Sequence, residues 1–234
     1  MVNTGAAARQ KAIVDWFNAA YAQKGDRYLR PTRAYTIYLE LLQAQPGQRL
    51  LDVACGLGRL LEAARPYGVK MFGIDISNVA VAAARQNVAE ATIEHGNAEQ
   101  LPYADASFDL VTCIGSLERV LNTETALAEM RRVGNANARF CILVRNSQTF
   151  SWKLKSMPPF ARNKGNAGAN TLEGWTQLLE SNGFAVQSVL PDQYPLHVRA
   201  QWKSLFLRPV DFNRPIAARL DRANEFLFLL EKDR

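Results

Sequence analysis

The sequence has little of what a membrane-spanning, secreted or metal-binding protein needs. No apolar stretch approaches the ~18 residues required to cross a bilayer, and the opening residues MVNTGAAARQK lack the apolar core of a signal peptide. The three cysteines, Cys55, Cys113 and Cys141, show no metal-ligand spacing and fall in predicted strands or at their ends. These features predict a cytoplasmic protein with reduced core thiols and no bound metal.

The sequence also lacks any run of five or more basic residues, although 28 Lys and Arg against 22 Asp and Glu give a net charge of +6. The basic residues are scattered, and no basic stripe with interleaved aromatic residues is present. This pattern favours a solvated basic surface over a nucleic-acid-binding one.

Strand-like and helix-like segments alternate along the whole chain. With 234 residues, 48% of them hydrophobic, the protein can bury one substantial core. Apolar runs predict strands near residues 49–54, 70–75, 91–95, 108–114, 139–145, 184–190 and 225–231. The alternation predicts an α/β fold with a doubly wound, mostly parallel sheet. The run EFLFLLE could be a membrane-binding helix, but its short length and bulky side chains favour a buried strand.

Several residues mark the predicted element ends. Ser77 and Thr171 are expected to cap the first turns of two helices, and Gly183 to end the second of them. A turn is expected over Gly134 to Asn137, and a short helix over Ile216 to Ala223.

The stretch RLLDVACGLGRLLEAA, residues 49–64, predicts a strand, a glycine-rich turn and an amphipathic helix. Gly56 is expected to allow a tight reversal, and Gly58 to leave room for a ligand against the backbone. Asp75 ends the next apolar run, where a carboxylate could accept both hydroxyls of a ribose. The third glycine of the dinucleotide fingerprint is replaced by Leu61, which disfavours a nicotinamide cofactor.

The motifs D-V-A-C-G-L-G-R and I-D-I-S resemble the first two motifs of class I S-adenosylmethionine-dependent methyltransferases. The stretch HGNAEQLPYADASFDLVTCIGSLERV, residues 95–120, is similar to the third and fourth strands of that family. The resemblance implies a Rossmann-like sheet of seven strands whose last strand is antiparallel. It covers residues 46–234 apart from insertions at 146–170 and 191–215, and leaves residues 1–45 as an N-terminal helical lid.

The resemblance also implies S-adenosylmethionine as the cofactor and assigns residues to it. In the family, the acid-x-Gly-x-Gly loop wraps the methionine part, the acid after the second strand holds the ribose, and an acid at the position of Asn97 meets the adenine amino group. The amide oxygen of Asn97 can still accept that hydrogen bond. Carbonyls after the fourth strand usually meet the cofactor's ammonium group. The predicted cofactor-binding residues are Asp52, Ala54, Cys55, Gly56, Gly58, Asp75, Ile76, Asn97, Ala98, Glu99, Ile114, Gly115, Ser116, Tyr21 and Tyr28.

The acceptor side is less well defined by the resemblance. Many relatives carry His where this chain has Arg119, so no role of that histidine is carried over. The expected reaction is in-line displacement of the methyl group by a small-molecule or carrier-linked acceptor, with Glu118 and His197 as candidate bases. The N-terminal helices, with Arg33 as a further candidate beside the cofactor, and residues 145–170 are expected to order over bound ligand.

Two other classes of function remain open from the sequence. A nicotinamide-dependent reductase would share Gly56, Gly58 and Asp75, and titration with NADH and S-adenosylmethionine would separate the two. A noncatalytic binding protein on the same fold is the other alternative, because Arg119 replaces the usual histidine. The loop CIGSL is unlike the Asn-Pro-Pro-Tyr loop of adenine-modifying methyltransferases, and the sequence defines neither the acceptor nor the oligomeric state.

Overall fold

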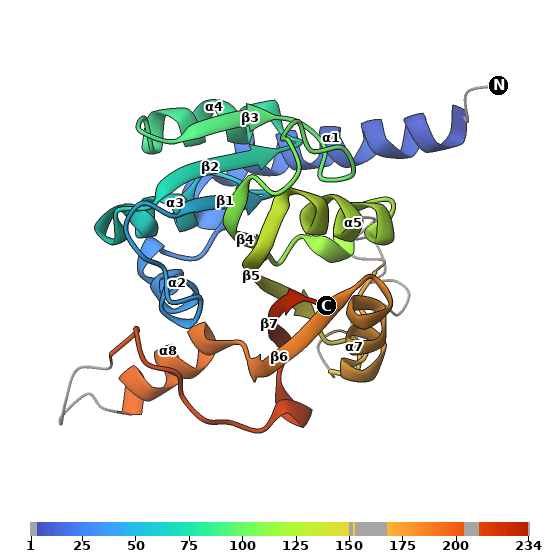
Figure 1. Ribbon diagram of the computed structural model, residues 1–234. Coiled ribbons are helices and arrows are strands. Elements are labelled where there is room, and N and C mark those ends of the chain that lie inside the picture. Colours follow the sequence, from blue (N-terminus) through green and yellow to red (C-terminus); the bar gives the residue numbers. More distant parts are fainter. Residues whose placement is uncertain (1–3, 150–151, 153–167, 204–210, 234) are drawn as a thin grey trace.

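Seven strands form a single sheet in the order β3-β2-β1-β4-β5-β7-β6 (Figure 1). The structure is a computed structural model that describes residues 4–149, 152, 168–203 and 211–233. Five strands pair in parallel, while β7 runs antiparallel to both β5 and β6. The predicted fold class is therefore confirmed. The strands are β1 Arg49–Val53, β2 Lys70–Asp75, β3 Thr92–His95, β4 Phe108–Ile114, β5 Gly134–Arg145, β6 Phe184–Pro191 and β7 Glu225–Lys232.

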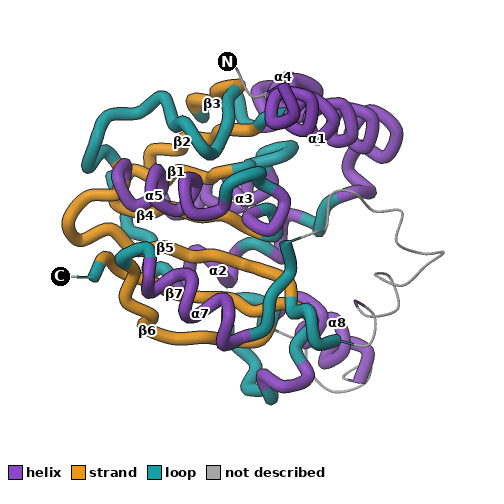
Figure 2. Tube along the Cα trace, turned by 90° about the vertical axis from the view of Figure 1, so that its right-hand side faces the viewer, coloured by secondary structure: helices purple, strands orange, loops and turns teal. Residues whose placement is uncertain are grey.

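Helices cover both faces of this sheet, with α2 and α3 on one side and α5 and α7 on the other (Figures 1 and 2). Among the described residues, no helix is long and apolar enough to cross a membrane. The α-helices are α1 Thr4–Lys24, α2 Thr36–Leu41, α3 Arg59–Ala64, α4 Asn78–Asn87, α5 Thr123–Val133, α7 Leu172–Ser181 and α8 Gln193–Lys203. The short 3-10 helices are η1 Gly25–Tyr28, η2 Thr32–Ala34, η3 Arg65–Tyr67, η4 Leu117–Arg119 and η5 Leu220–Arg222.

The predicted helix caps are present. Ser77 Oγ accepts the Ala80 N–H at 3.1 Å, and Thr171 Oγ1 accepts the Gly174 N–H at 3.0 Å. Gly183 follows α7 with a φ of +78°, the left-handed geometry that ends a helix.

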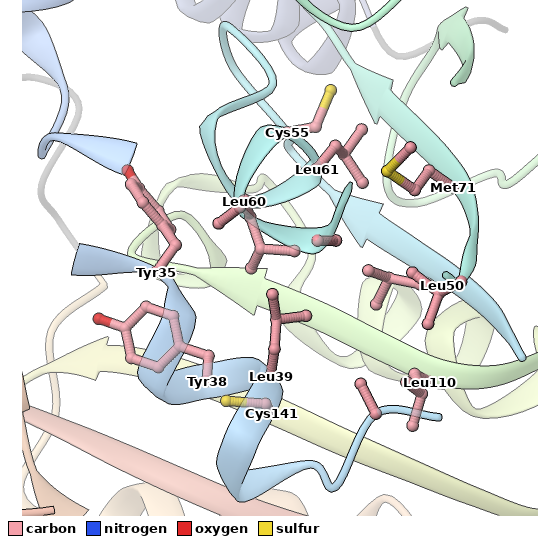
Figure 3. Packing of buried hydrophobic residues seen from close by; sticks show 14 of the residues in the cluster. Tyr35, Tyr38, Leu39, Leu50, Cys55, Leu60, Leu61, Met71, Leu110 and Cys141 are labelled. Atoms are coloured by element: carbon pink, nitrogen blue, oxygen red, sulfur yellow. The ribbon is translucent and has the colours of Figure 1, made fainter. Parts of the chain in front are cut away.

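The central strands β1, β4 and β7 are buried on both faces, which explains their nearly continuous apolar sequences. Along β7, Leu227 faces one core cluster, while Phe226 and Phe228 face the other. The run EFLFLLE is therefore a core strand, as predicted. Figure 3 shows the first cluster, in which Tyr38 and Leu39 of α2 lie close to α3 and the sheet.

Three local expectations need correction. The predicted turn over Gly134 to Asn137 belongs to β5, where Asn135 Nδ2 donates to Asp109 Oδ1 at 2.7 Å and holds an irregular stretch against β4. The predicted helix over Ile216 to Ala223 is reduced to η5, because the Ile216 N–H donates to Gln193 Oε1 at 2.7 Å instead of to a helical carbonyl. Helix α8 lies in a segment for which no helix was predicted.

A buried ion cluster ties the chain after α1 to the last two strands of the sheet. Arg30 donates to both carboxylate oxygens of Asp192 at 2.7 Å and to Tyr38 Oη at 2.8 Å. The same guanidinium pairs with Glu225 at the start of β7. Because Asp192 and Glu225 are largely buried, the pairing fixes the segment between α1 and α2 in place.

Replacing Arg30 by Met should lower the free energy of unfolding by about 3 to 5 kcal/mol. Asp192 loses its cationic partner, and Glu225 keeps only the more distant Arg145, at 3.7 Å. Urea denaturation measures the change. The matched control is Arg219→Met, whose side chain is 74% exposed and whose loss should cost less than about 0.5 kcal/mol. Equal effects of the two variants would show that the cluster does not anchor this segment.

Candidate functional site

The loop between β1 and α3 lies at the point where the strand order reverses, between β1 and β4. Ala54, Gly56 and Gly58 have left-handed φ values of +59°, +53° and +79°. A left-handed alanine costs of order 1 kcal/mol or more, so the surrounding structure must impose this shape. In α/β sheets, ligands bind in the crevice at this reversal.

Gly56 has the left-handed φ that a tight reversal requires, whereas Gly58 is glycine for a different reason than the sequence suggested. A Cβ on Gly58 would lie 3.2 Å from Val88 Cγ2 and 3.4 Å from Ala84 Cβ, so this residue lets the loop pack on α4. The expectation that Gly58 leaves room for a ligand is therefore wrong. A Cβ on Gly56 would instead lie 2.8 Å from Tyr21 Oη, on the side of the loop that faces a hollow.

Asp75 links this loop to the next helix. Its carboxylate accepts the Gly56 N–H at 2.8 Å and the Ser77 N–H at 2.9 Å. Burial raises the pKa of Asp75 above its usual value, and the two backbone donors oppose that shift. The carboxylate thus fixes the loop while lining the adjacent hollow.

Two adjoining hollows bring together every predicted cofactor-binding residue except Gly58, although their role in binding stays a prediction. The first is lined by Asp75, Ile76, Asn97, Ala98 and Glu99. The second is lined by Asp52, Cys55, Gly56, Tyr28, Ile114 and Gly115, and both are lined by Ala54, Tyr21 and Ser116.

One face of α1 also lines these hollows and was not predicted. Gln10, Ile13 and Phe17 precede Tyr21 at spacings of three, four and four residues, which place them on one helix face. That spacing was readable in the sequence. Tyr35 and Arg59 were missed as well, because nothing local marks them; both line the second hollow.

Burial governs the other titratable groups of the loop. Asp52 accepts a hydrogen bond from Thr112 Oγ1 at 2.7 Å, and burial raises its pKa to about 7. Burial also raises the pKa of the Cys55 thiol well above its usual value, so this cysteine is held as a thiol and does not provide a nucleophile.

A third, larger hollow of about 1080 Å³ adjoins the first and lies between α1 and η4. Glu118 lines it with a fully buried side chain, and Arg145 Nε lies 3.0 Å from Glu118 Oε1 without the alignment of a hydrogen bond. Among the described residues, the buried side-chain atoms without a hydrogen-bond partner are Glu118 Oε1 and Oε2, Arg119 Nε and Arg145 Nε. Such atoms are rare in native structures and concentrate here at one place.

The structure does not bring His197 to these hollows. It lies on α8, at the opposite end of the molecule from α1 and α4 (Figure 1), with its Nε2 atom 2.8 Å from the Arg214 carbonyl and its ring beside Phe212. Arg33 also contacts Phe212, and lines none of the three hollows. Most of the predicted lid over 145–170 lies outside the described residues.

Comparison with known proteins agrees with this geometry. Residues 51–142 match the family model described as a methyltransferase domain. The chain is 38% identical over 117 residues to a demethylmenaquinone methyltransferase of Symbiobacterium thermophilum, covering 46% of each protein. It is 30% identical over 174 residues to the enzyme of that name from Renibacterium salmoninarum, covering 71% of this chain and 68% of the relative. The matches thus span from about half to two thirds of these relatives.

The chain belongs to the class I S-adenosylmethionine-dependent methyltransferases. A solved structure supports the fold: a chain of the Haloferax volcanii complex between the Trm112 methyltransferase activator and a putative methyltransferase has a TM-score of 0.70 at 18% identity, covering 93% of this chain and 98% of that one. Family membership implies S-adenosylmethionine as the cofactor.

Because the pKa of Asp52 is raised, we expect the stability of this methyltransferase to depend on pH. Because the folded pKa is about 7 against a usual 3.8, the native state holds the proton more tightly, and this group's contribution to stability is lost as the pH rises from about 4 to about 7. Asp52→Asn removes the effect, so its unfolding free energy should rise relative to wild type across that window, by up to about 4 kcal/mol.

Urea denaturation at pH values of about 5 and about 8 measures this difference. Thr112→Val keeps Asp52 but removes its hydrogen-bond donor, and should retain the pH dependence, shifted upward. A pH-independent difference between Asp52→Asn and wild type would show that Asp52 stays ionised in the folded protein.

Proposed function

We propose that this chain binds S-adenosylmethionine in the two hollows beside Gly56 and transfers its methyl group to a small-molecule or carrier-linked acceptor held in the larger hollow. The observation that carries the proposal is the continuity of these spaces: Ile13, Phe17, Glu99, Arg119 and Val120 line both the first hollow and the larger one. The acceptor space therefore adjoins the proposed cofactor space directly.

The residues present fit the cofactor. Asp75 offers a buried carboxylate for two ribose hydroxyls, and its bonds to Gly56 and Ser77 hold it in place. Asn97 Oδ1 already accepts the Glu99 N–H at 3.0 Å and has a second lone pair for an adenine amino group. Backbone around Ile114 and Gly115 would meet the cofactor's ammonium end. When bound, the cofactor supplies a methyl group on a positively charged sulphur.

The choice of a small acceptor rests on two kinds of support. The larger hollow has the size of a small-molecule pocket, and two relatives are named for methylation of demethylmenaquinone. This chain's contribution to in-line transfer is to hold both reactants and exclude water, which can supply ~7 to 11 kcal/mol of the barrier reduction.

Glu118 is the proposed base when the acceptor is a hydroxyl or another group that must lose a proton. Glu118 is one of the residues that line the larger hollow, its side chain is fully buried, and neither carboxylate oxygen accepts a hydrogen bond among the described residues. Arg145 Nε lies 3.0 Å from Glu118 Oε1 and offsets the charge of the carboxylate. The other predicted base, His197, lines none of the three hollows.

The test of the proposed function uses methyl-labelled S-adenosylmethionine and a cell extract divided by size. Label should pass into the deproteinised, nuclease-treated small-molecule fraction or onto a carrier protein from which mild hydrolysis releases it. No transfer to any fraction, or stable label in nucleic acid or protein side chains, would overturn the proposal.

Asp75→Ala should weaken binding of S-adenosylhomocysteine at least about tenfold, because charge-assisted hydrogen bonds of ~1.5 to 3 kcal/mol each are lost. Calorimetry measures the affinity, and thermal unfolding checks that the variant folds. The control is Asp105→Ala, whose side chain is 78% exposed and outside the three hollows. Unchanged affinity in Asp75→Ala would remove the ribose assignment.

Glu118→Gln should lower the rate of methyl transfer into the small-molecule fraction by about 10²- to 10⁴-fold if Glu118 removes a proton. S-adenosylhomocysteine affinity should not change, because Glu118 lines neither of the two hollows beside Gly56. The exposed Glu180→Gln on α7 is the matched control. A rate equal to wild type would show that the acceptor needs no base at this position.

A further inference from the structure

Arg119 is a cation without an anionic partner at the junction of all three hollows. It lines each of them, and the described residues include no carboxylate within ion-pair distance of its guanidinium. The stretches outside the described ranges contain no Asp or Glu in the sequence. No acidic side chain of this chain therefore neutralises Arg119.

The guanidinium is nevertheless held in position. Arg119 Nη1 donates to Tyr28 Oη at 2.8 Å, and the Trp16 and Phe17 rings of α1 lie 5.9 and 5.6 Å from its central carbon. Cation–π contacts and a phenol bond orient an arginine without cancelling its charge. Its buried Nε has no hydrogen-bond acceptor, so part of its bonding capacity is unused.

The acids closest to Arg119 along the larger hollow are engaged elsewhere. Glu118 lies against Arg145, and Glu99 Oε1 accepts the Leu121 N–H at 2.9 Å. The remaining cation of that wall is Arg9, which is exposed on α1. Each acid of the larger hollow is therefore engaged by another group, and neither forms an ion pair with Arg119.

The walls beside Arg119 are mostly apolar. The larger hollow is lined by the apolar residues Ala12, Ile13, Trp16, Val120 and Leu121. A ligand that fits both the charge and these walls has an apolar body and one anionic group. Arginine presents parallel N–H donors that match the planar carboxylate and the phosphate group.

We propose that Arg119 determines acceptor specificity by binding a carboxylate or phosphate on an otherwise apolar acceptor. That the bound molecule is the methyl acceptor rests on the proposed function, whereas the anion site itself can be tested separately. It assigns to Arg119 a role in substrate choice.

The test compares ligands that differ in charge while keeping a similar body. The pairs are para-hydroxybenzoate and para-hydroxybenzamide, octanoate and octanamide, and phenyl phosphate and phenol. Ligand-detected NMR titration gives each dissociation constant, with and without S-adenosylhomocysteine. In at least one pair, wild-type protein should bind the acid about tenfold or more tightly than the neutral partner, and the pair that responds separates carboxylate from phosphate.

Two variants and one control assign that preference to Arg119. Arg119→Met should abolish it, Arg119→Lys should keep part of it, and the exposed Arg219→Met should keep all of it. Thermal unfolding shows that each variant is folded, and calorimetry separately measures its affinity for S-adenosylhomocysteine.

Three outcomes would overturn the proposal: no acid preference in any pair, a preference that survives in Arg119→Met, or an equal loss of S-adenosylhomocysteine binding, which would assign Arg119 to the cofactor's own carboxylate. Acid preference in a wild-type protein that does not bind S-adenosylhomocysteine would leave the anion site standing and remove the proposed methyl transfer. The two failures are thus distinguishable.

Discussion

The carboxylate of Asp75 fixes the shape on which the rest of the site depends. It accepts one N–H from the loop after β1 and one from the turn that begins α4. A single side chain therefore links the segments that follow β1 and β2. Burial makes the ionised form costly, and the two backbone donors offset that cost. The left-handed residues of the loop are tolerated because these bonds and the packing on α4 determine the backbone there.

Features set by local sequence could be predicted well. The central strands follow from apolar runs that are buried on both faces. The caps at Ser77 and Thr171 follow from side chains that satisfy free helical amides. The predicted cofactor residues other than Gly58 meet at two hollows because parallel strands end at the same edge of a sheet. The reason given for Gly58 failed because its neighbours, Ala84 and Val88, come from another element.

Features set by contacts between distant segments could not be predicted. Nothing near Arg30 in the sequence indicates Asp192 or Glu225, and nothing near Glu118 indicates Arg145. His197 was plausible as a base because histidine titrates near neutral pH, yet α8 carries it to the far end of the molecule and its ring is used beside Phe212. A residue type suggests chemistry, whereas only the fold decides which residues meet.

The proposed cofactor side and the proposed acceptor side of the site differ in how their buried polar groups are paired. On the cofactor side, each buried carboxylate has its own partners: Asp75 has two backbone amides and Asp52 has the Thr112 hydroxyl. On the acceptor side, Glu118 and Arg119 bring opposite charges to one hollow and leave buried atoms unpaired. Unpaired buried polar atoms cost free energy, so each one needs an explanation, such as a role in catalysis or binding. Under the proposed function, the cofactor half is thus preorganised by bonds within the chain, whereas the acceptor half has polar atoms that its ligand would complete.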